Sequence, residues 1–279
     1  MQTIAVGWLV YRITHSPFLL GMVGFAGQLP MLLLTPVAGV LSDRWPRRRV
    51  LVATQSLAML QALTLAGLTL SGIIQVWHLV ALAVFSGAIN SFDVPTRQAF
   101  TLEMVGRKED LPNAIALNSS LFNASRLIGP TVAGVLISLV GEGTCFLLNG
   151  LSYIAVIAAL LSMRLVRPQA HALQENLLRD LQVGVHYAFG FLPIRNILLL
   201  LAVVSLVGMP YTVLMPVFAK DVLRGGAQTL GILMACAGVG ALTGTIYLAA
   251  RNSVSYWAVL AAACWRLCSA SLRAPSVAS

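Results

Sequence analysis

This sequence has little charge, since Asp, Glu, Lys and Arg together make up only 10% of its 279 residues. A soluble globular domain carries about 25% charged residues. Hydrophobic residues make up 58% of the chain. They form uncharged runs of about 20 residues, the length that a helix needs to cross the roughly 30 Å hydrocarbon core of a bilayer. The composition therefore excludes an ordinary soluble domain and predicts an all-α integral membrane protein built as a helical bundle.

Several chemical signatures are missing as well. The four cysteines have neither metal-ligand spacing nor the density of a disulfide framework. The chain has no H-E-x-x-H, no G-x-x-x-x-G-K-[ST] and no paired carboxylates within its apolar runs. These absences leave a membrane-embedded enzyme without support. We expect no catalytic residue, no metal and no cofactor.

The net charge of +9 is spread over short loops between the apolar runs. A nucleic-acid-binding protein would gather its basic residues on one face of a soluble fold. Spread over loops, positive charge is an orientation signal instead. We therefore expect the lipid bilayer, and no nucleic acid, as a partner. The first residues have no basic region and no cleavage site, so no secretory signal peptide is predicted.

The apolar runs predict about eight membrane spans. The first, at 4–11, is a partial span, because so short a helix covers only about 12 Å. The full spans are expected at 18–41, 50–70, 76–95, 113–138, 144–163, 194–217 and 228–249.

The longest loop divides these spans into two groups. Residues 1–163 form an N-terminal six-span half, and residues 194–252 begin a C-terminal half with two spans. Between them, 164–193 is a predicted cytoplasmic linker with an amphipathic helix, which either lies at the membrane interface or packs on the bundle. Residues 253–279 form an atypical tail, either a partial span or a misread end.

Loop charges predict the orientation. If the loop at 42–49 is cytoplasmic, the loops on its side carry eleven Lys and Arg residues, against three on the other side. Under the positive-inside rule this asymmetry places the loop at 42–49 in the cytoplasm, with the chain in the cell's inner membrane.

That loop also carries a motif. The segment GVLSDRWPRRRVL, from Gly39 to Leu51, resembles the signature between the second and third helices of the major facilitator superfamily, G-x-L-A-D-R-x-G-R-R-x-x-L. The matching residues are Gly39, Leu41, Asp43, Arg44, Arg47, Arg48 and Leu51. Ser42 replaces the alanine of the signature, and Pro46 replaces its second glycine, which predicts a stiffer turn.

A second segment is similar to the exporter branch of this superfamily, which includes the enterobactin exporter and the macrolide efflux proteins. Its matching pieces are D-x-P-x-R-Q-A, at 93–99, and R-x-I-G-P-x-x-x-G, at 126–134. The resemblance implies two six-span halves around a central substrate site, and export of a small molecule by alternating access. It also implies that this chain is truncated at both ends and would not transport alone.

The motifs suggest roles for the charged residues. We expect Asp43 to pair with Arg97 and hold the cytoplasmic side shut, with Asp93 nearby; the alternative is that each charge reaches water separately. Arg126 is expected near the bilayer middle, about 20 Å along its helix. There it either lines the transport path or relays charge, or else it belongs to a structural ion pair.

Gly129 and Pro130 follow Arg126 and predict a kink, and Gly134 adds a small residue for close packing. In the resembled family this kink is associated with antiport, although helix packing alone explains the same residues. Proton coupling stays open, because the deep spans contain no Asp or Glu. A non-transporting fragment, a structural membrane protein and a channel remain the alternatives to a carrier.

Overall fold

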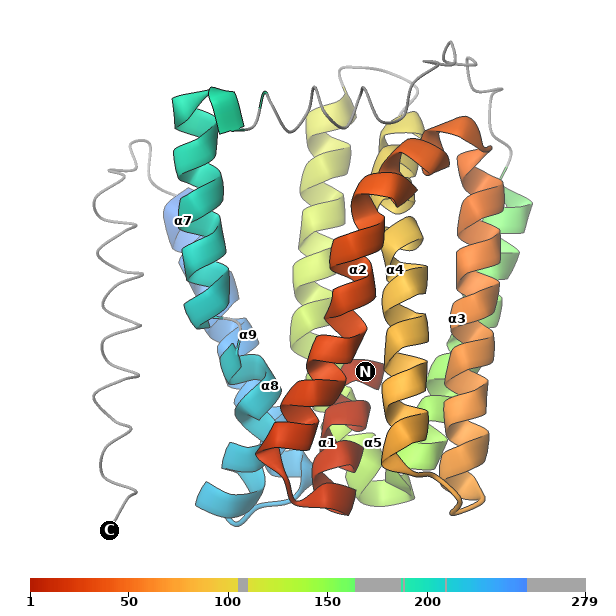
Figure 1. Cartoon of the computed structure of the whole chain (residues 1–279), viewed down its shortest axis with the longest axis vertical. Coiled ribbons are helices and arrows are strands. Elements are labelled where there is room, and N and C mark those ends of the chain that lie inside the picture. Colours follow the sequence, from red (N-terminus) through yellow and green to blue (C-terminus); the bar gives the residue numbers. More distant parts are fainter. Residues whose placement is uncertain (105–109, 164–186, 188, 209, 250–279) are drawn as a thin grey trace.

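The computed structural model describes residues 1–104, 110–163, 187, 189–208 and 210–249. All regular elements of this part are helical, and they form an upright bundle (Figure 1). They are α1 (Gln2–Thr14), α2 (Pro17–Arg44), α3 (Arg47–Leu70), α4 (Val76–Met104), α5 (Leu111–Ser162), α7 (Leu192–Gly208), α8 (Pro210–Val217), the π-helix η2 (Phe218–Val222) and α9 (Ala227–Ala249). The predicted linker helix lies largely outside the described residues, and the tail at 253–279 lies entirely outside them.

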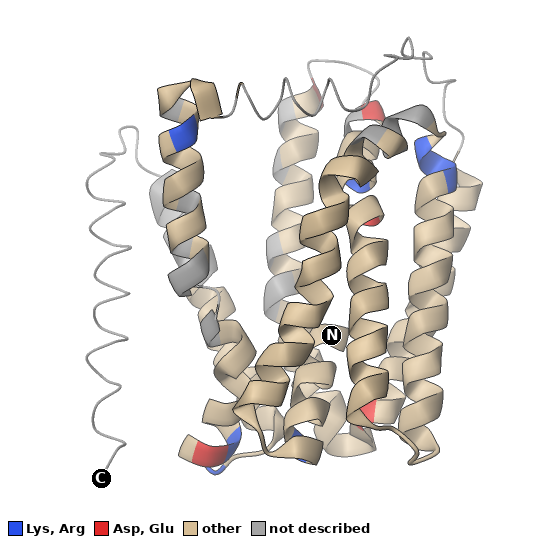
Figure 2. Cartoon of the chain, viewed as in Figure 1, with Lys and Arg blue, Asp and Glu red and all other residues tan. Residues whose placement is uncertain are grey.

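Four segments of this bundle are long and apolar enough to cross a membrane. They are Pro17–Gly39, Arg47–Leu70, Val76–Thr101 and Ile128–Ser162. Large apolar side chains such as Phe18, Leu32 and Leu139 are more than 70% exposed, as expected where lipid replaces water around a protein. Among the described residues, Figure 2 shows those with charge toward the two ends of the bundle and a middle almost free of them. The chain is therefore an all-helical membrane protein.

Helix α5 joins two of the predicted spans, at 113–138 and 144–163. Its backbone leaves the helical conformation at Gly141, where φ is 81° and ψ is 170°. A positive φ is easily reached only by glycine, so this residue permits the turn. Beyond it the chain runs antiparallel to α3, because Gly143 faces Leu70 whereas Gly150 faces Leu63.

The fourth predicted span ends too early. The fourth span was expected to end at residue 95, next to the charges of Asp93 and Arg97, yet α4 continues through Pro95 to Met104. Proline is tolerated within membrane helices. Arg97 therefore lies within a helix and not in a loop.

Close helix crossings depend on glycine. Helices α2 and α4 meet at Gly27 and Gly87, where a Cβ on Gly87 would collide with the Gly27 carbonyl oxygen. Helices α5 and α9 meet at Gly134, where a Cβ would lie 2.7 Å from the Ala227 carbonyl oxygen and 2.8 Å from the Cα of Gly231. The second crossing brings α9 against the first half of the chain.

Candidate functional site

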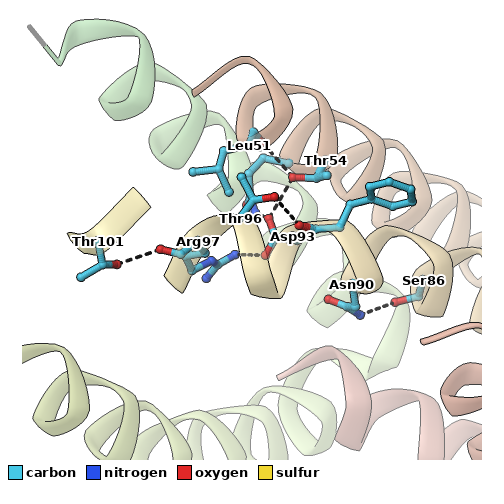
Figure 3. A network of polar contacts seen from close by, with 10 residues as sticks. Leu51, Thr54, Ser86, Asn90, Asp93, Thr96, Arg97 and Thr101 are labelled. Carbon is cyan, nitrogen blue, oxygen red and sulfur yellow. Dashed lines mark hydrogen bonds and ion pairs between the residues drawn. The ribbon is translucent and has the colours of Figure 1, made fainter. Parts of the chain in front are cut away.

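A buried carboxylate lies between α3 and α4. Asp93 is only 4% exposed, and its Oδ1 accepts hydrogen bonds from Thr54 Oγ1 at 2.9 Å and from Gln55 Nε2 at 2.6 Å. Its Oδ2 pairs with the guanidinium of Arg97, one turn further along α4 (Figure 3). Buried charge is tolerated when it is paired and hydrogen-bonded, and both oxygens of Asp93 are. This cluster ties the two helices together.

The arginine-rich segment clamps the same end of the bundle. Arg47 Nη1 lies 2.7 Å from Glu103 Oε1 and donates to the Ala99 carbonyl oxygen at 3.3 Å, so the start of α3 is attached to the end of α4. Arg48 donates to the carbonyl oxygen of Leu161, near the end of α5. Arg47 and Arg48 of the motif therefore bind residues outside their own helix.

Arg97, the expected partner of Asp43, already has another partner. Arg97 forms an ion pair with Asp93 on its own helix. The side chains of Asp43 and Arg44 lie outside the described residues, so the pairing of Asp43 with Arg97 stays a prediction. Gly39 faces open space, since a Cβ there would meet no atom within 4 Å.

The segment of α5 with the predicted kink, at Gly129 and Pro130, lies beside the start of the chain and beside α9. A Cβ on Gly129 would be 3.8 Å from the backbone nitrogen of Met1, and Pro130 is followed one turn later by the Gly134 crossing with α9. The side chain of Arg126 lies outside the described residues, so its expected role in the transport path also stays a prediction.

The opposite end of the bundle has a polar cluster that the sequence analysis did not predict. The hydroxyl of Tyr11 donates to Asp221 Oδ2, which joins α1 to η2 across 210 positions of the chain. Lys220 Nζ lies 3.4 Å from His15 Nδ1 and 5.6 Å from the centre of the Tyr11 ring. No local pattern reveals these contacts, because the partners are distant in sequence.

A second polar contact at this end lies within the first half of the chain. Arg12 Nε and Glu142 Oε1 are 3.2 Å apart. Glu142 follows the Gly141 break, and its side chain is only 5% exposed. The sequence analysis placed both residues on this side of the membrane but did not pair them.

Between the two ends lies a cavity of about 600 Å³. It is lined by α1, α2, α3, α4, α5, α8 and α9, so both halves of the chain contribute. The described lining residues include no Asp, Glu, Lys or Arg. Its polar side chains are mostly carboxamides and hydroxyls: Gln2, Thr3, Gln28, Gln61, Ser86, Asn90, Asn149, Tyr153 and Thr212.

Three of these carboxamides are linked. Gln2 Nε2 donates to Gln61 Oε1 at 2.5 Å, and Asn149 Nδ2 donates to Gln2 Oε1 at 2.9 Å. Gln61 in turn donates to the Leu82 carbonyl oxygen at 3.3 Å. The sequence analysis missed them. The available signal was a single carboxamide within an otherwise apolar run, as at Gln61 and Asn149.

Comparison with known proteins adds an independent finding. A family model described as "transmembrane secretion effector" matches residues 1–276. The chain is 28% identical to the "Staphyloferrin A transporter" of Staphylococcus aureus over 248 residues, which cover 88% of this chain and 62% of that protein. It is also 28% identical to the "Multidrug efflux pump Tap" of Mycolicibacterium fortuitum, over 87% of this chain and 61% of the pump.

A third relative is the "Macrolide efflux protein A" of Streptococcus pyogenes, which is 22% identical over 84% of this chain and 58% of its own length. The chain therefore spans about three fifths of the length of the curated relatives it matches. All three names describe transport proteins.

Proposed function

The chain belongs to the transmembrane secretion effector family of the major facilitator superfamily, and from that premise we propose that it serves in a secondary active transporter that exports small molecules. The observation that carries this proposal is the central cavity between two polar clusters. In transporters of this type the substrate binds near the middle of the membrane, between two halves that rock against each other.

The cavity has the properties of a small-molecule site. Ligand pockets have volumes of roughly 300–1,000 Å³ and combine apolar walls with a few polar groups that orient the ligand. The walls here are apolar side chains such as Leu65, Leu79 and Leu230, and the polar groups are carboxamides and hydroxyls. The drugs and the siderophore in the relatives' names support the same broad class of cargo for this chain.

We propose the following arrangement in the membrane. Residues 1–163 form the six-span half with its partial first span, 164–193 form the linker and 194–252 begin the second half, which gives about eight spans. The loop at 42–49 faces the cytoplasm of a cell whose plasma membrane holds the chain. The excess of basic residues on that side supports this orientation.

Within that arrangement the two ends act as gates. Contacts between α1 and η2 close the outer end, whereas Asp43 pairs with the Asp93–Arg97 cluster when the cytoplasmic end closes. Arg126 lines the path, and the kink at Gly129 and Pro130 keeps α5 close to α9. If export is driven by protons, Asp93 is our candidate carrier, because it is the buried carboxylate of the α3–α4 cluster.

Efflux from cells that express the full-length gene tests the proposal. We expect saturable export of drug-like or siderophore-like compounds that stops when an uncoupler removes the proton gradient. Replacing Gln61 or Asn149 with leucine should reduce export at least fivefold while the amount of protein is unchanged, whereas Ser152→Ala, on an exposed face of α5, should not.

Other outcomes overturn the proposal. Flux that does not saturate and needs no gradient would indicate a channel, and no flux at all would indicate a structural or non-transporting membrane protein. Orientation is tested separately with cysteines at positions 46 and 226 and a reagent that cannot cross membranes. Labelling of position 46 in intact cells would contradict the proposed orientation, as would protection of position 226.

A further inference from the structure

A second hollow lies on α3 and α4, away from the central cavity. It is a groove of about 460 Å³ whose described lining contains, besides apolar residues, only Arg49 and Thr54 as polar residues. Its walls are two matching helix faces, each spaced i, i+3, i+4 and i+7. These are Val50, Ala53, Thr54 and Leu57 on α3, and Phe85, Ala88, Ile89 and Phe92 on α4.

The groove exists because these faces do not fill the space between them. Residues at this spacing share one face of a helix and normally interdigitate with a neighbour. Here Ala53 and Ala88 lie near the middle of the two faces, and such small side chains cannot fill the space between the helices. Leu57 and Phe85 are 42% and 38% exposed, so the opening is apolar too.

One end of the groove is basic and aromatic. Trp45, Pro46 and Arg49 lie there, at the start of α3, where the helix enters the membrane. Trp45 is 53% exposed, and tryptophan is enriched at the level of lipid headgroups. Arg47 and Arg48 bind Glu103 and Leu161, but in the part of the chain that the structure describes, the guanidinium of Arg49 has no hydrogen bond or ion pair.

We propose that this groove is a binding site for an anionic phospholipid. One acyl chain lies between the faces of α3 and α4, and Arg49 binds the phosphate. A guanidinium matches the geometry of a phosphate and is attracted to anionic headgroups. The bilayer is the source of this ligand, because the groove begins at headgroup depth and continues into the apolar part of the same helices.

The site lies against the buried carboxylate cluster. Thr54 lines the groove and also donates its hydroxyl to Asp93. A lipid that fills the groove therefore packs against a residue that holds α3 to α4. The proposal does not depend on transport, and its test needs none.

Tryptophan quenching tests the site in the purified 279-residue chain. Phosphatidylglycerol or phosphatidylcholine with brominated acyl chains is added in detergent, and the part of the quenching that Trp45→Phe removes reports the groove. We expect this part to require about fivefold less phosphatidylglycerol than phosphatidylcholine, as one basic residue near an anionic headgroup predicts. In Arg49→Gln the two lipids should quench equally, whereas Arg195→Gln, an exposed arginine on α7, should keep the preference.

Ala88→Leu tests the apolar part of the groove, since the larger side chain should weaken quenching by both lipids. Three outcomes overturn the proposal: equal quenching by the two lipids in the unchanged chain, a preference that survives in Arg49→Gln, or no contribution of Trp45 at all. The last would mean that another segment covers the groove. None of these outcomes bears on whether the protein exports small molecules.

Discussion

The two ends of the bundle use polar contacts differently. At the arginine-rich end, Asp93–Arg97 and Arg47–Glu103 join residues of the first half only, as does the bond from Arg48 to Leu161. At the opposite end, the bond from Tyr11 to Asp221 joins the first half to the second. With the proposed halves at 1–163 and 194–252, the described contacts of the arginine-rich end form a clamp within one half. The opposite end has, besides the Arg12–Glu142 pair within that half, a contact between the halves.

Contacts within a half and contacts between halves should affect different properties of the protein. If the proposed halves separate during transport, a contact within a half moves as part of a rigid unit, whereas a contact between halves must break. Substitutions of the described contacts at the arginine-rich end should therefore change mainly the free energy of unfolding, whereas the proposed pairing of Asp43 is the part of that end that would open and close. Substitutions between α1 and η2 should change mainly how often the outer end opens.

The largest effect on stability is expected from Asp93→Ala. The substitution leaves the buried Gln55 without its acceptor and Thr54 with only the Leu51 carbonyl oxygen, and it should lower the free energy of unfolding by about 3 kcal/mol. Asp221→Ala removes the carboxylate of the other end, but that residue is exposed, so its loss should be below about 1 kcal/mol. Unfolding in mixed detergent measures both. Equal losses would remove the distinction between the two ends.

Gly134→Ala should have the next largest effect. The new Cβ would lie 2.7 Å from a backbone oxygen of α9, which cannot move aside, so we expect a loss of about 2 kcal/mol in the free energy of unfolding. Gly143→Ala is the matched control within the first half, because its Cβ would meet the flexible end of Leu70. If the control costs as much as Gly134→Ala, the α5–α9 crossing has no special role.

The sequence predicted the helices well and their contacts poorly. Long apolar runs set the spans and predicted two of them within what became α5. The end of the fourth span was placed too early, next to the charges of Asp93 and Arg97, whereas α4 carries both charges within the helix and continues through Pro95 to Met104.

Only the charged part of the candidate site could be predicted from the sequence. The pattern around Asp93 and Arg97 drew attention to the region where the structure has a buried carboxylate and its ion pair, since charges are rare in apolar helices and stand out. The cavity carboxamides and the contact of Tyr11 with Asp221 were missed, because neutral polar residues do not stand out and distant partners leave no local pattern. The membrane family itself was predicted from the loop motif, and the match over residues 1–276 confirms it.

Opening of the outer end can be measured with a native cysteine. Cys145 is 1% exposed and belongs to the same buried cluster as Tyr11. With the other cysteines changed to serine, Tyr11→Phe should raise the rate of maleimide labelling at Cys145 about fivefold, the effect of losing one hydrogen bond. Arg47→Gln should leave the rate unchanged. If both variants label equally fast, the contact of Tyr11 with Asp221 controls opening no more than the contact of Arg47 with Glu103 does.

The smallest effect should come from the ion pair between Arg47 and Glu103, whose side chains are 24% and 33% exposed. Water screens such a pair, so a double-mutant cycle with Arg47→Gln and Glu103→Gln should give a coupling of only about 0.5 kcal/mol that weakens in salt. The same cycle on Arg12 and Glu142 should give a larger coupling that salt changes less, because the Glu142 side chain is only 5% exposed. If the order of the two couplings is reversed, the strength of these pairs is set by the arginine motif and not by burial.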